Sequence, residues 1–172
     1  YNSNGIDINR DCGYMWNAEG SSTDAFSQPE SKALREFVVS NPAVIHITYH
    51  SGTQNILYLW GYRFSATPDN THHTYLANLY ASSSGYSNLL VQQASAMYIV
   101  YGATDDAAYG TMGSMSYTME MSYNKQPAGT LINYYYQANK SAMLEMIEKA
   151  GEGISGIVTD AVTGKPVKDA MV

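Results

Sequence analysis

Apolar positions along the chain first fall into short runs that are typical of strands. Residues 44–49 form an apolar, mostly β-branched run, residues 56–60 form a second, and residues 114–121 alternate apolar with polar positions. The long stretch 1–26 is rich in Gly, Asn, Ser and Asp, and is expected to be a strand end followed by a loop. These runs predict the buried strands of one sheet, with the run at 44–49 as the central strand.

A second pattern spaces apolar residues three and four positions apart, as in amphipathic helices. The segment Ser27–Glu30 is a capping box with proline in the first turn, and it predicts a helix that ends before Pro42. Further helices are expected over about 69–82 and 139–151, whereas residues 102–113 are expected to form a loop. Because strands and helices alternate, the sequence predicts an α/β fold with a mixed β-sheet flanked by helices.

The character of the sequence changes near residue 152. Residues 1–151 carry the alternating pattern, and a chain of 172 residues can bury one sizeable core. Residues 153–160 predict a new strand, and residues 163–166 predict a turn, so 152–172 are expected to be the first strands of a truncated small β-sandwich. The chain begins without methionine or a signal-type apolar segment, so we expect truncation at both ends.

Composition narrows the possible partners. The net charge is −6 and the nine basic residues form no cluster, which argues against nucleic-acid binding. No apolar run approaches the roughly 20 residues that span a membrane. Sixteen tyrosines with many Ser, Gly and Asn are typical of a secreted or cell-envelope protein, so an extracellular or periplasmic location is expected. Cys12 is the single cysteine and is expected to be a small buried residue; the oligomeric state stays open.

Four histidines are candidates for chemistry. His50 follows the apolar run at 44–49, and ligands of open α/β sheets bind where strands end, so His50 is a candidate metal ligand or base. The alternative is a hydrogen-bonded structural histidine. His46 shares a strand face with His50 and is expected to be a core residue, whereas His72 and His73 are expected to be solvated at a helix start.

Several short blocks of the sequence occur together in one order and spacing. They are Gly5–Arg10, Phe26–Glu30, His50-Ser51, Tyr58–Tyr62, Asp105–Gly110 and Tyr117–Glu120. In this arrangement the chain resembles zinc carboxypeptidases of the M14 type over about residues 5–150. The resemblance implies a mixed sheet flanked by helices, and removal of single C-terminal amino acids from peptides by a zinc-bound water. The tail from Gly153 resembles the start of a transthyretin-like, regulatory-like domain.

The resemblance implies a role for two residues at strand ends. His50 matches the third protein ligand of the zinc. Glu120 matches the general acid/base, which takes a proton from the zinc-bound water and passes it to the leaving amine. Apolar surroundings would raise the proton affinity of that carboxylate, and Tyr117, Met119 and Met121 are such neighbours in the sequence. The alternative for Glu120 is an exposed or paired side chain on an edge strand.

Further positions match residues that bind the substrate. Asn9 and Arg10 match the pair that binds the terminal carboxylate of the peptide, for which a guanidinium fork is suited. Tyr98 matches a mobile tyrosine that closes over the substrate, and Ser51 is included among the substrate-binding candidates. Without the resemblance, an Asn-Arg pair in a loop is most often solvated and a tyrosine is most often packed.

The resemblance also places Asp105 at the floor of the specificity pocket. An acid at this position implies a preference for Lys or Arg at the substrate C-terminus. The alternative is an Asp in an Asx turn, and a slip of one residue would exchange it with Asp106. Ala107 stands where tryptophan is common, and Asp11 and Cys12 stand where the family usually has Asn and an aromatic residue, so altered pocket packing is expected.

The resemblance implies residues that the chain does not contain. The family has an H-x-x-E pair of zinc ligands and a carbonyl-polarising arginine upstream of the position of Asp7, and no H-x-x-E occurs here. Catalytic zinc generally needs three protein ligands, so two are expected upstream of residue 1 and the fragment is expected to be inactive alone, with an exposed sheet edge. The alternative is a non-catalytic peptide-binding or envelope-attached module of the same fold. Under both hypotheses, the enzyme fragment and the binding module, the expected partners are peptide or protein C-termini.

Overall fold

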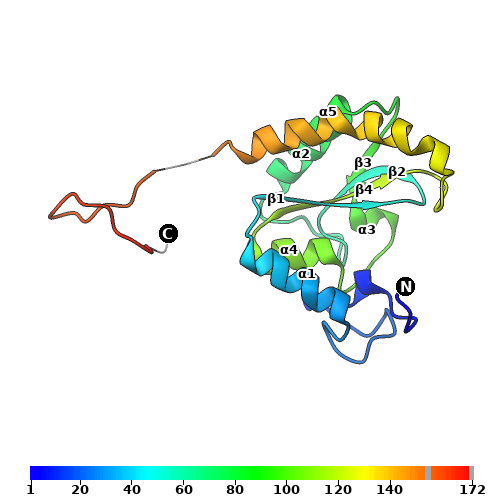
Figure 1. Ribbon diagram of the computed structural model, residues 1–172, viewed down its shortest axis with the longest axis horizontal. Coiled ribbons are helices and arrows are strands. Elements are labelled where there is room, and N and C mark those ends of the chain that lie inside the picture. The colour runs from blue at the N-terminus through cyan, green and yellow to red at the C-terminus, as the bar shows by residue number, and fades with distance from the viewer. Residues whose placement is uncertain (154–155, 171–172) are drawn as a thin grey trace.

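A mixed sheet of four strands forms the centre of the computed structural model, which describes residues 1–153 and 156–170 (Figure 1). The strand order is β1-β4-β2-β3. Strand β4 pairs in parallel with β1 and antiparallel with β2, and β2 pairs in parallel with β3. The strands are β1 (Ile45–His50), β2 (Gln54–Tyr58), β3 (Leu90–Gln93) and β4 (Met115–Met121). The predicted mixed sheet is confirmed.

Helices cover both faces of the sheet (Figure 1). Helices α2 (Asn70–Ser83) and α5 (Ile132–Ala150) lie on one face, while α1 (Pro29–Ser40) and α4 (Thr104–Met112) lie on the other. The remaining helical segments are short: η1 (Ile8–Arg10), α3 (Ala94–Met97) and η2 (Gly129–Leu131). The predicted α/β layer arrangement is therefore confirmed. None of the described helices combines the length and the apolar character needed to cross a lipid bilayer.

The two faces of the sheet differ in polarity because side chains alternate along each strand. Tyr117, Met119 and Ile56 are fully buried in the core beneath α2 and α5. The alternate positions of β4 are polar, and Thr118 donates a hydrogen bond to Asp105 of α4. Cross-strand partners on this polar face are His46–Ser116, Thr48–Thr118 and His50–Glu120. The apolar face stabilises the fold, and the polar face leads to the candidate site.

Within residues 102–113 the chain forms helix α4 (Thr104–Met112), so the prediction of a loop is wrong. Glycines stand at both ends of this segment, and both have positive φ, at Gly102 (φ 65) and Gly113 (φ 74). Gly113 ends the helix in the left-handed conformation that suits glycine. The helix is held by tertiary contacts, since Ala107 and Ala108 are buried. A short helix between glycines has too little periodicity to be recognised from sequence.

The start of α1 also differs from the prediction. The N-cap residue is Gln28, without a side-chain capping bond, so the predicted capping box does not form. The hydroxyl of Ser27 donates instead to Oδ1 of Asp11, at 3.0 Å. Because the Ser27 hydroxyl bonds to Asp11, a residue distant in the sequence, it does not cap the helix. Helix α5 begins at Ile132, earlier than the predicted start near Asn139, and β3 and α3 were not predicted.

Strand β1 lies at an edge of the described sheet, although the run at 44–49 was predicted to be central and buried. Its residues are mostly half-buried, and the preceding Val44 is 58% exposed. An exposed sheet edge was expected, but not at this strand.

The predicted boundary at residue 152 stays a prediction. Part of the strand expected at 153–160 falls on residues 154–155, which lie outside the described residues. Within the described tail, Thr159 and Pro166 form an isolated antiparallel bridge, and residues 161–163 form a turn between them.

Candidate active site

Two adjoining hollows, with about 40 and 490 Å³ of room for water-sized molecules, lie beside the ends of β1 and β4. Segments far apart in the sequence meet there, because β4 inserts between β1 and β2. Asp105 lines the smaller hollow and Ser51 lines the larger one. Both hollows are lined by Asn9, Arg10, His50, Met97, Tyr98 and Glu120. Every site residue predicted from the sequence thus lines at least one of the two hollows.

His50 and Glu120 stand opposite each other in the register of β1 and β4. Strand β4 is internal to the sheet, so Glu120 is not on an edge strand. The Glu120 side chain is buried, and its Oε2 has no hydrogen-bond partner in the described structure. Burial raises the pKa of Glu120, while the charges of His50 and Lys125 act to lower it. A buried carboxylate with one uncommitted oxygen is suited to exchanging a proton with a bound molecule.

The neighbours that bury Glu120 are not the ones predicted. Tyr117 and Met119 were expected to provide its apolar surroundings, but Met119 precedes it directly and both residues face the opposite side of the sheet. Asn55 of β2 is the cross-strand partner of Glu120, and Leu57 lines the same hollow. Residues of the adjacent strand, rather than sequence neighbours, therefore share the face of the sheet on which the Glu120 side chain lies.

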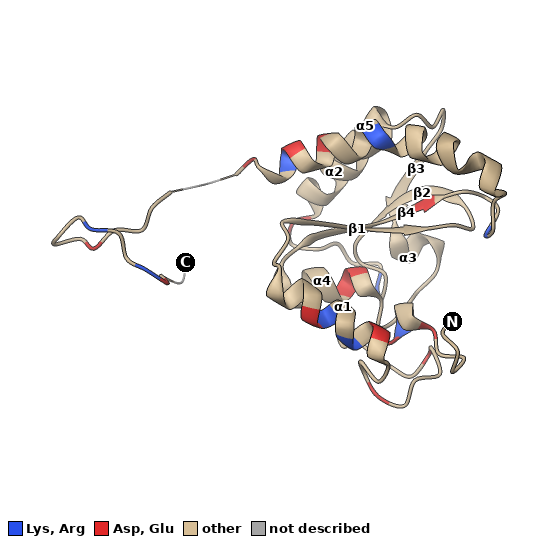
Figure 2. Ribbon diagram, in the orientation of Figure 1, with Lys and Arg blue, Asp and Glu red and all other residues tan. Residues whose placement is uncertain are grey.

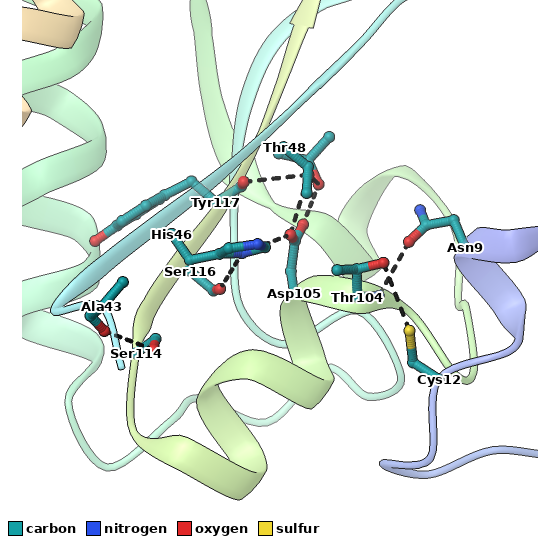
Figure 3. Close-up of polar contacts among 11 residues, drawn as sticks. Asn9, Cys12, Ala43, His46, Thr48, Thr104, Asp105, Ser114, Ser116 and Tyr117 are labelled. Atoms are coloured by element: carbon teal, nitrogen blue, oxygen red, sulfur yellow. Dashed lines mark hydrogen bonds and ion pairs between the residues drawn. The ribbon is translucent and has the colours of Figure 1, made fainter. Parts of the chain in front are cut away.

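Asn9 is oriented by one hydrogen bond from its backbone amide and another to its side-chain oxygen. The side chain of Asp7 caps η1 by accepting from the Asn9 amide, at 3.0 Å. The Asn9 Oδ1 accepts from the backbone amide of Thr104, at 3.0 Å, so its Nδ2 points away from α4 (Figure 3). This amide nitrogen is a donor at the wall of the hollow.

Arg10 and Tyr98 face each other at the same hollow. The Arg10 guanidinium lies 5.9 Å from the centre of the Tyr98 ring, and its Nη1 donates to the Asn9 carbonyl at 2.8 Å. Glu19 is 3.7 Å from the Arg10 Nε. Tyr98 is 51% exposed, as a side chain at a cavity mouth would be. The arrangement places a cation beside a half-exposed aromatic ring.

Asp105 and Asp106 turn toward different parts of the fold. Asp105 accepts a hydrogen bond from the hydroxyl of Thr48 (Figure 3). It accepts another from the hydroxyl of Thr118, which lies on the same polar face of the sheet. Asp106 accepts from the backbone amides of Gly61 and Tyr62 at 3.0 and 3.1 Å, and burial raises its pKa to about 6. Asp105 lies in the first turn of α4, so the alternative of an Asx turn does not hold.

Ser51 and Lys125 close the larger hollow. The Ser51 hydroxyl donates to the Lys125 carbonyl, at 2.8 Å, and ties the segment after β1 to the segment after β4. The Lys125 side chain lines the hollow beside Glu120, and sequence reasoning missed it. No local pattern marks a lysine in this loop; its position follows from the pairing of β1 with β4.

The other histidines lie outside the hollows. His73 is fully buried between Tyr109 and Tyr117, where burial lowers its pKa to about 4, so the prediction that it is solvated is wrong. Its neighbour His72 is exposed, as expected. His46 is half-buried and lies near Ser116.

A catalytic zinc generally needs three protein ligands. Across residues 1–153 and 156–170, no group of three His, Cys, Asp or Glu side chains is placed to hold a metal ion. His50 and the uncommitted oxygen of Glu120 suit a site that holds a metal and a water, but they are an incomplete donor set. The described residues do not fit a zinc by themselves.

Basic side chains are dispersed over the part of the chain that the structure describes. The basic residues are spread over α1, α5 and several loops instead of gathering on one face (Figure 2).

Comparison with known proteins adds to this geometry. The sequence pattern that defines the zinc carboxypeptidase family matches residues 1–152. Carboxypeptidase E of Caenorhabditis elegans is 26% identical, across 84% of this chain and 36% of its own length. Carboxypeptidase D of Drosophila melanogaster is 29% identical, across 84% of this chain and 12% of its own length. The chain thus spans only a minor part of these curated relatives.

Solved structures share the fold. Bovine thrombin-activatable fibrinolysis inhibitor, solved in complex with tick carboxypeptidase inhibitor, aligns with a TM-score of 0.68 and 22% identity, over 84% of this chain and 55% of its own. Carboxypeptidase A from Helicoverpa armigera aligns with a TM-score of 0.69 and 20% identity, over 84% and 41% of the two chains.

Proposed function

Because this chain belongs to the zinc carboxypeptidase family, we propose that it is part of a metallocarboxypeptidase that removes single amino acids from the C-termini of peptides. One observation carries the proposal: the buried Glu120 carboxylate, with its uncommitted oxygen, faces the same hollow as Arg10. A cation that can bind a terminal carboxylate and a group that can exchange a proton are thereby placed around one cavity.

The residues of this chain then take the following roles. Arg10 and the Nδ2 of Asn9 bind the terminal carboxylate of the peptide, and Tyr98 covers it. Glu120 accepts a proton from the attacking water and returns it to the nitrogen of the leaving amino acid. A zinc held by His50 together with further ligands would polarise the carbonyl and supply a water of lowered pKa. His50 is one ligand, and the others are supplied from outside this sequence, so the chain alone does not hydrolyse peptides.

Replacing His50 by Asn tests the zinc role in the longer protein that carries this sequence. Loss of one of three ligands is expected to lower zinc content after dialysis to a small fraction of the wild-type value, with release of C-terminal amino acids falling by about 10³-fold. Metal content is measured by mass spectrometry and release by amino-acid analysis. His72→Asn, at an exposed position of α2, is the matched control.

Two outcomes would contradict the proposal. Unchanged zinc content in His50→Asn would remove His50 from the ligand set. A zinc-loaded wild-type protein that binds peptides without releasing amino acids would instead favour the non-catalytic binding module, for which the incomplete donor set of this chain is the supporting observation.

Asp105 at the wall of the smaller hollow supports a preference for peptides that end in Lys or Arg. Asp105→Asn keeps the shape of the side chain and removes its charge. We expect kcat/KM for a peptide ending in Arg to fall by about tenfold or more, with little change for one ending in Leu. The measurement is the ratio of the two kcat/KM values. A wild-type enzyme that cleaves C-terminal Phe faster than Arg would refute this preference.

Two further features of the protein are proposed from sequence. The abundance of Tyr, Ser, Gly and Asn supports a secreted or cell-envelope location. The change of pattern at residue 152, with the bridge between Thr159 and Pro166, supports the start of a transthyretin-like domain over 152–172. Limited proteolysis of the longer protein tests the second point, since a separate domain predicts preferred cleavage near the boundary.

A further inference from the structure

Polar side chains of the sheet surround Asp105, the acid proposed to select the substrate side chain, and one of them is His46. His46, two positions before Thr48 on β1, faces α4, and its Nδ1 lies 3.0 Å from the Ser116 hydroxyl. The same nitrogen lies 3.7 Å from Oδ1 of Asp105 (Figure 3). Thr48 donates to that Oδ1 at 3.0 Å, and Thr118 donates to the other oxygen. The Asp105 carboxylate is therefore held in one position by three side chains of the sheet.

Of these three side chains, only the imidazole can carry a charge. Hydroxyl groups stay neutral over the physiological range, whereas an unperturbed imidazole changes charge between about pH 5 and 8. The His46 and Asp105 side chains are only 16% and 11% exposed, so solvent screens their interaction weakly. A protonated ring at this distance would offset the negative charge of Asp105.

The other charged groups on α4, β4 and α5 have different positions. On α4, Asp106 accepts from backbone amides at residues 61 and 62, and the hydroxyl of Tyr109 donates to Asp69. On β4, Glu120 stands opposite His50, four positions further along β1. Helix α5, which carries Glu145 and Lys149, covers the opposite face of the sheet (Figure 1). Asp105 is the acid that His46 directly faces.

We propose that His46 is a specificity-determining residue, which sets the effective charge of the pocket wall through its contact with Asp105. With a neutral imidazole, the pocket carries the full negative charge of Asp105 and selects C-terminal Lys or Arg. With a protonated imidazole, the pair is close to neutral and the pocket accepts uncharged side chains nearly as well. This inference rests on the proposed carboxypeptidase function.

The test measures selectivity as a ratio of dissociation constants, so effects of pH on the shared parts of the site cancel. The probes are benzoyl-Gly-Arg and benzoyl-Gly-Leu, and binding is measured by calorimetry at about pH 8.5 and about pH 5.5, where imidazoles change charge. The guanidinium of the first probe stays charged throughout. The longer, zinc-loaded protein carries Glu120→Gln to prevent turnover. We expect the preference for Arg to fall by about tenfold at the lower pH.

Substitutions separate the charge of His46 from its structural role. In His46→Gln the preference should be high and independent of pH, since the hydrogen bond to Ser116 can form without a charge. In His46→Lys it should be low at both pH values. The control His72→Gln should follow the wild type. Asp105→Asn should show a low, pH-independent preference, and it provides a second measurement if variants of His46 do not fold.

Each outcome bears on the inference. A wild-type preference that is equal at both pH values, or a pH dependence that persists in His46→Gln, would overturn the role of His46 and leave the proposed function standing. A folded, zinc-loaded protein that binds neither probe would refute the proposed function. The role of His46 would then fail as well, because there would be no substrate pocket for it to control.

Discussion

Replacement of Glu120 by Gln is expected to lower kcat of the longer protein by about 10³-fold, while the affinity for peptides changes by less than about threefold. Gln has the same shape and can fill the same buried position at the end of β4. Its amide cannot accept a proton from water at neutral pH, so the step assigned to Glu120 is lost. The contacts of Arg10 and Asn9 with the peptide carboxylate do not involve this side chain and should persist.

The measurement combines steady-state kinetics with calorimetric binding of an uncleaved peptide. Glu36→Gln, on an exposed part of α1, removes the same charge at a distance and should leave both values unchanged. Turnover retained in Glu120→Gln would show that another group moves the proton. Loss of binding together with turnover would instead point to a structural role for the carboxylate.

Removal of the Asp11 carboxylate is expected to lower the free energy of unfolding by about 3 kcal/mol at pH 7. The side chain is fully buried and accepts hydrogen bonds from the hydroxyls of Ser27 and Ser31 and the amide of Gln28. These contacts attach the start of α1 to the segment that carries Asn9. In Asp11→Ala the buried donors lose their acceptor, and the cost of desolvating them remains.

The stability from Asp11 also has a predictable pH dependence. Burial acts to raise the pKa of Asp11, but hydrogen bonds from Ser31, Gln28, Ser22 and Ser27 together lower it below its usual value of 3.8. A carboxylate with a lowered pKa in the folded state stabilises the fold above the unfolded-state pKa, and this contribution is lost as the pH falls through the folded-state pKa. Asp11→Asn should therefore cost less stability near pH 3 than at pH 7.

Urea unfolding at the two pH values measures both effects, with Asp24→Asn, an exposed position in the same loop, as the control. Equal midpoints for Asp11→Ala and wild type at pH 7 would show that these hydrogen bonds add no net stability. A cost for Asp11→Asn that grows toward pH 3 would contradict the direction of the pKa shift.

Local sequence patterns predicted the elements that have strong periodicity. The alternation at 114–121 became β4, and the helical stripe from about residue 69 became α2. Such patterns work because a strand or helix with one buried face has to repeat apolar residues at its own period. They failed for α4, which is short and bounded by glycines. They also failed for His73, because its polar sequence neighbours suggested a solvated position.

Sequence alone determined the residue types around the candidate site and their order along the chain, because the blocks that carry Asn9, Arg10, His50 and Glu120 are local motifs. Tertiary structure decided how these residues meet. Alternation fixes which side chains share a face of a strand, but not which strand becomes its partner. The insertion of β4 between β1 and β2 places Glu120 opposite His50 and buries it against Asn55 and Leu57. The same insertion brings α4 beneath β1, which joins Asp105 to His46. Strand pairing depends on long-range packing, so it cannot be predicted from a local sequence pattern.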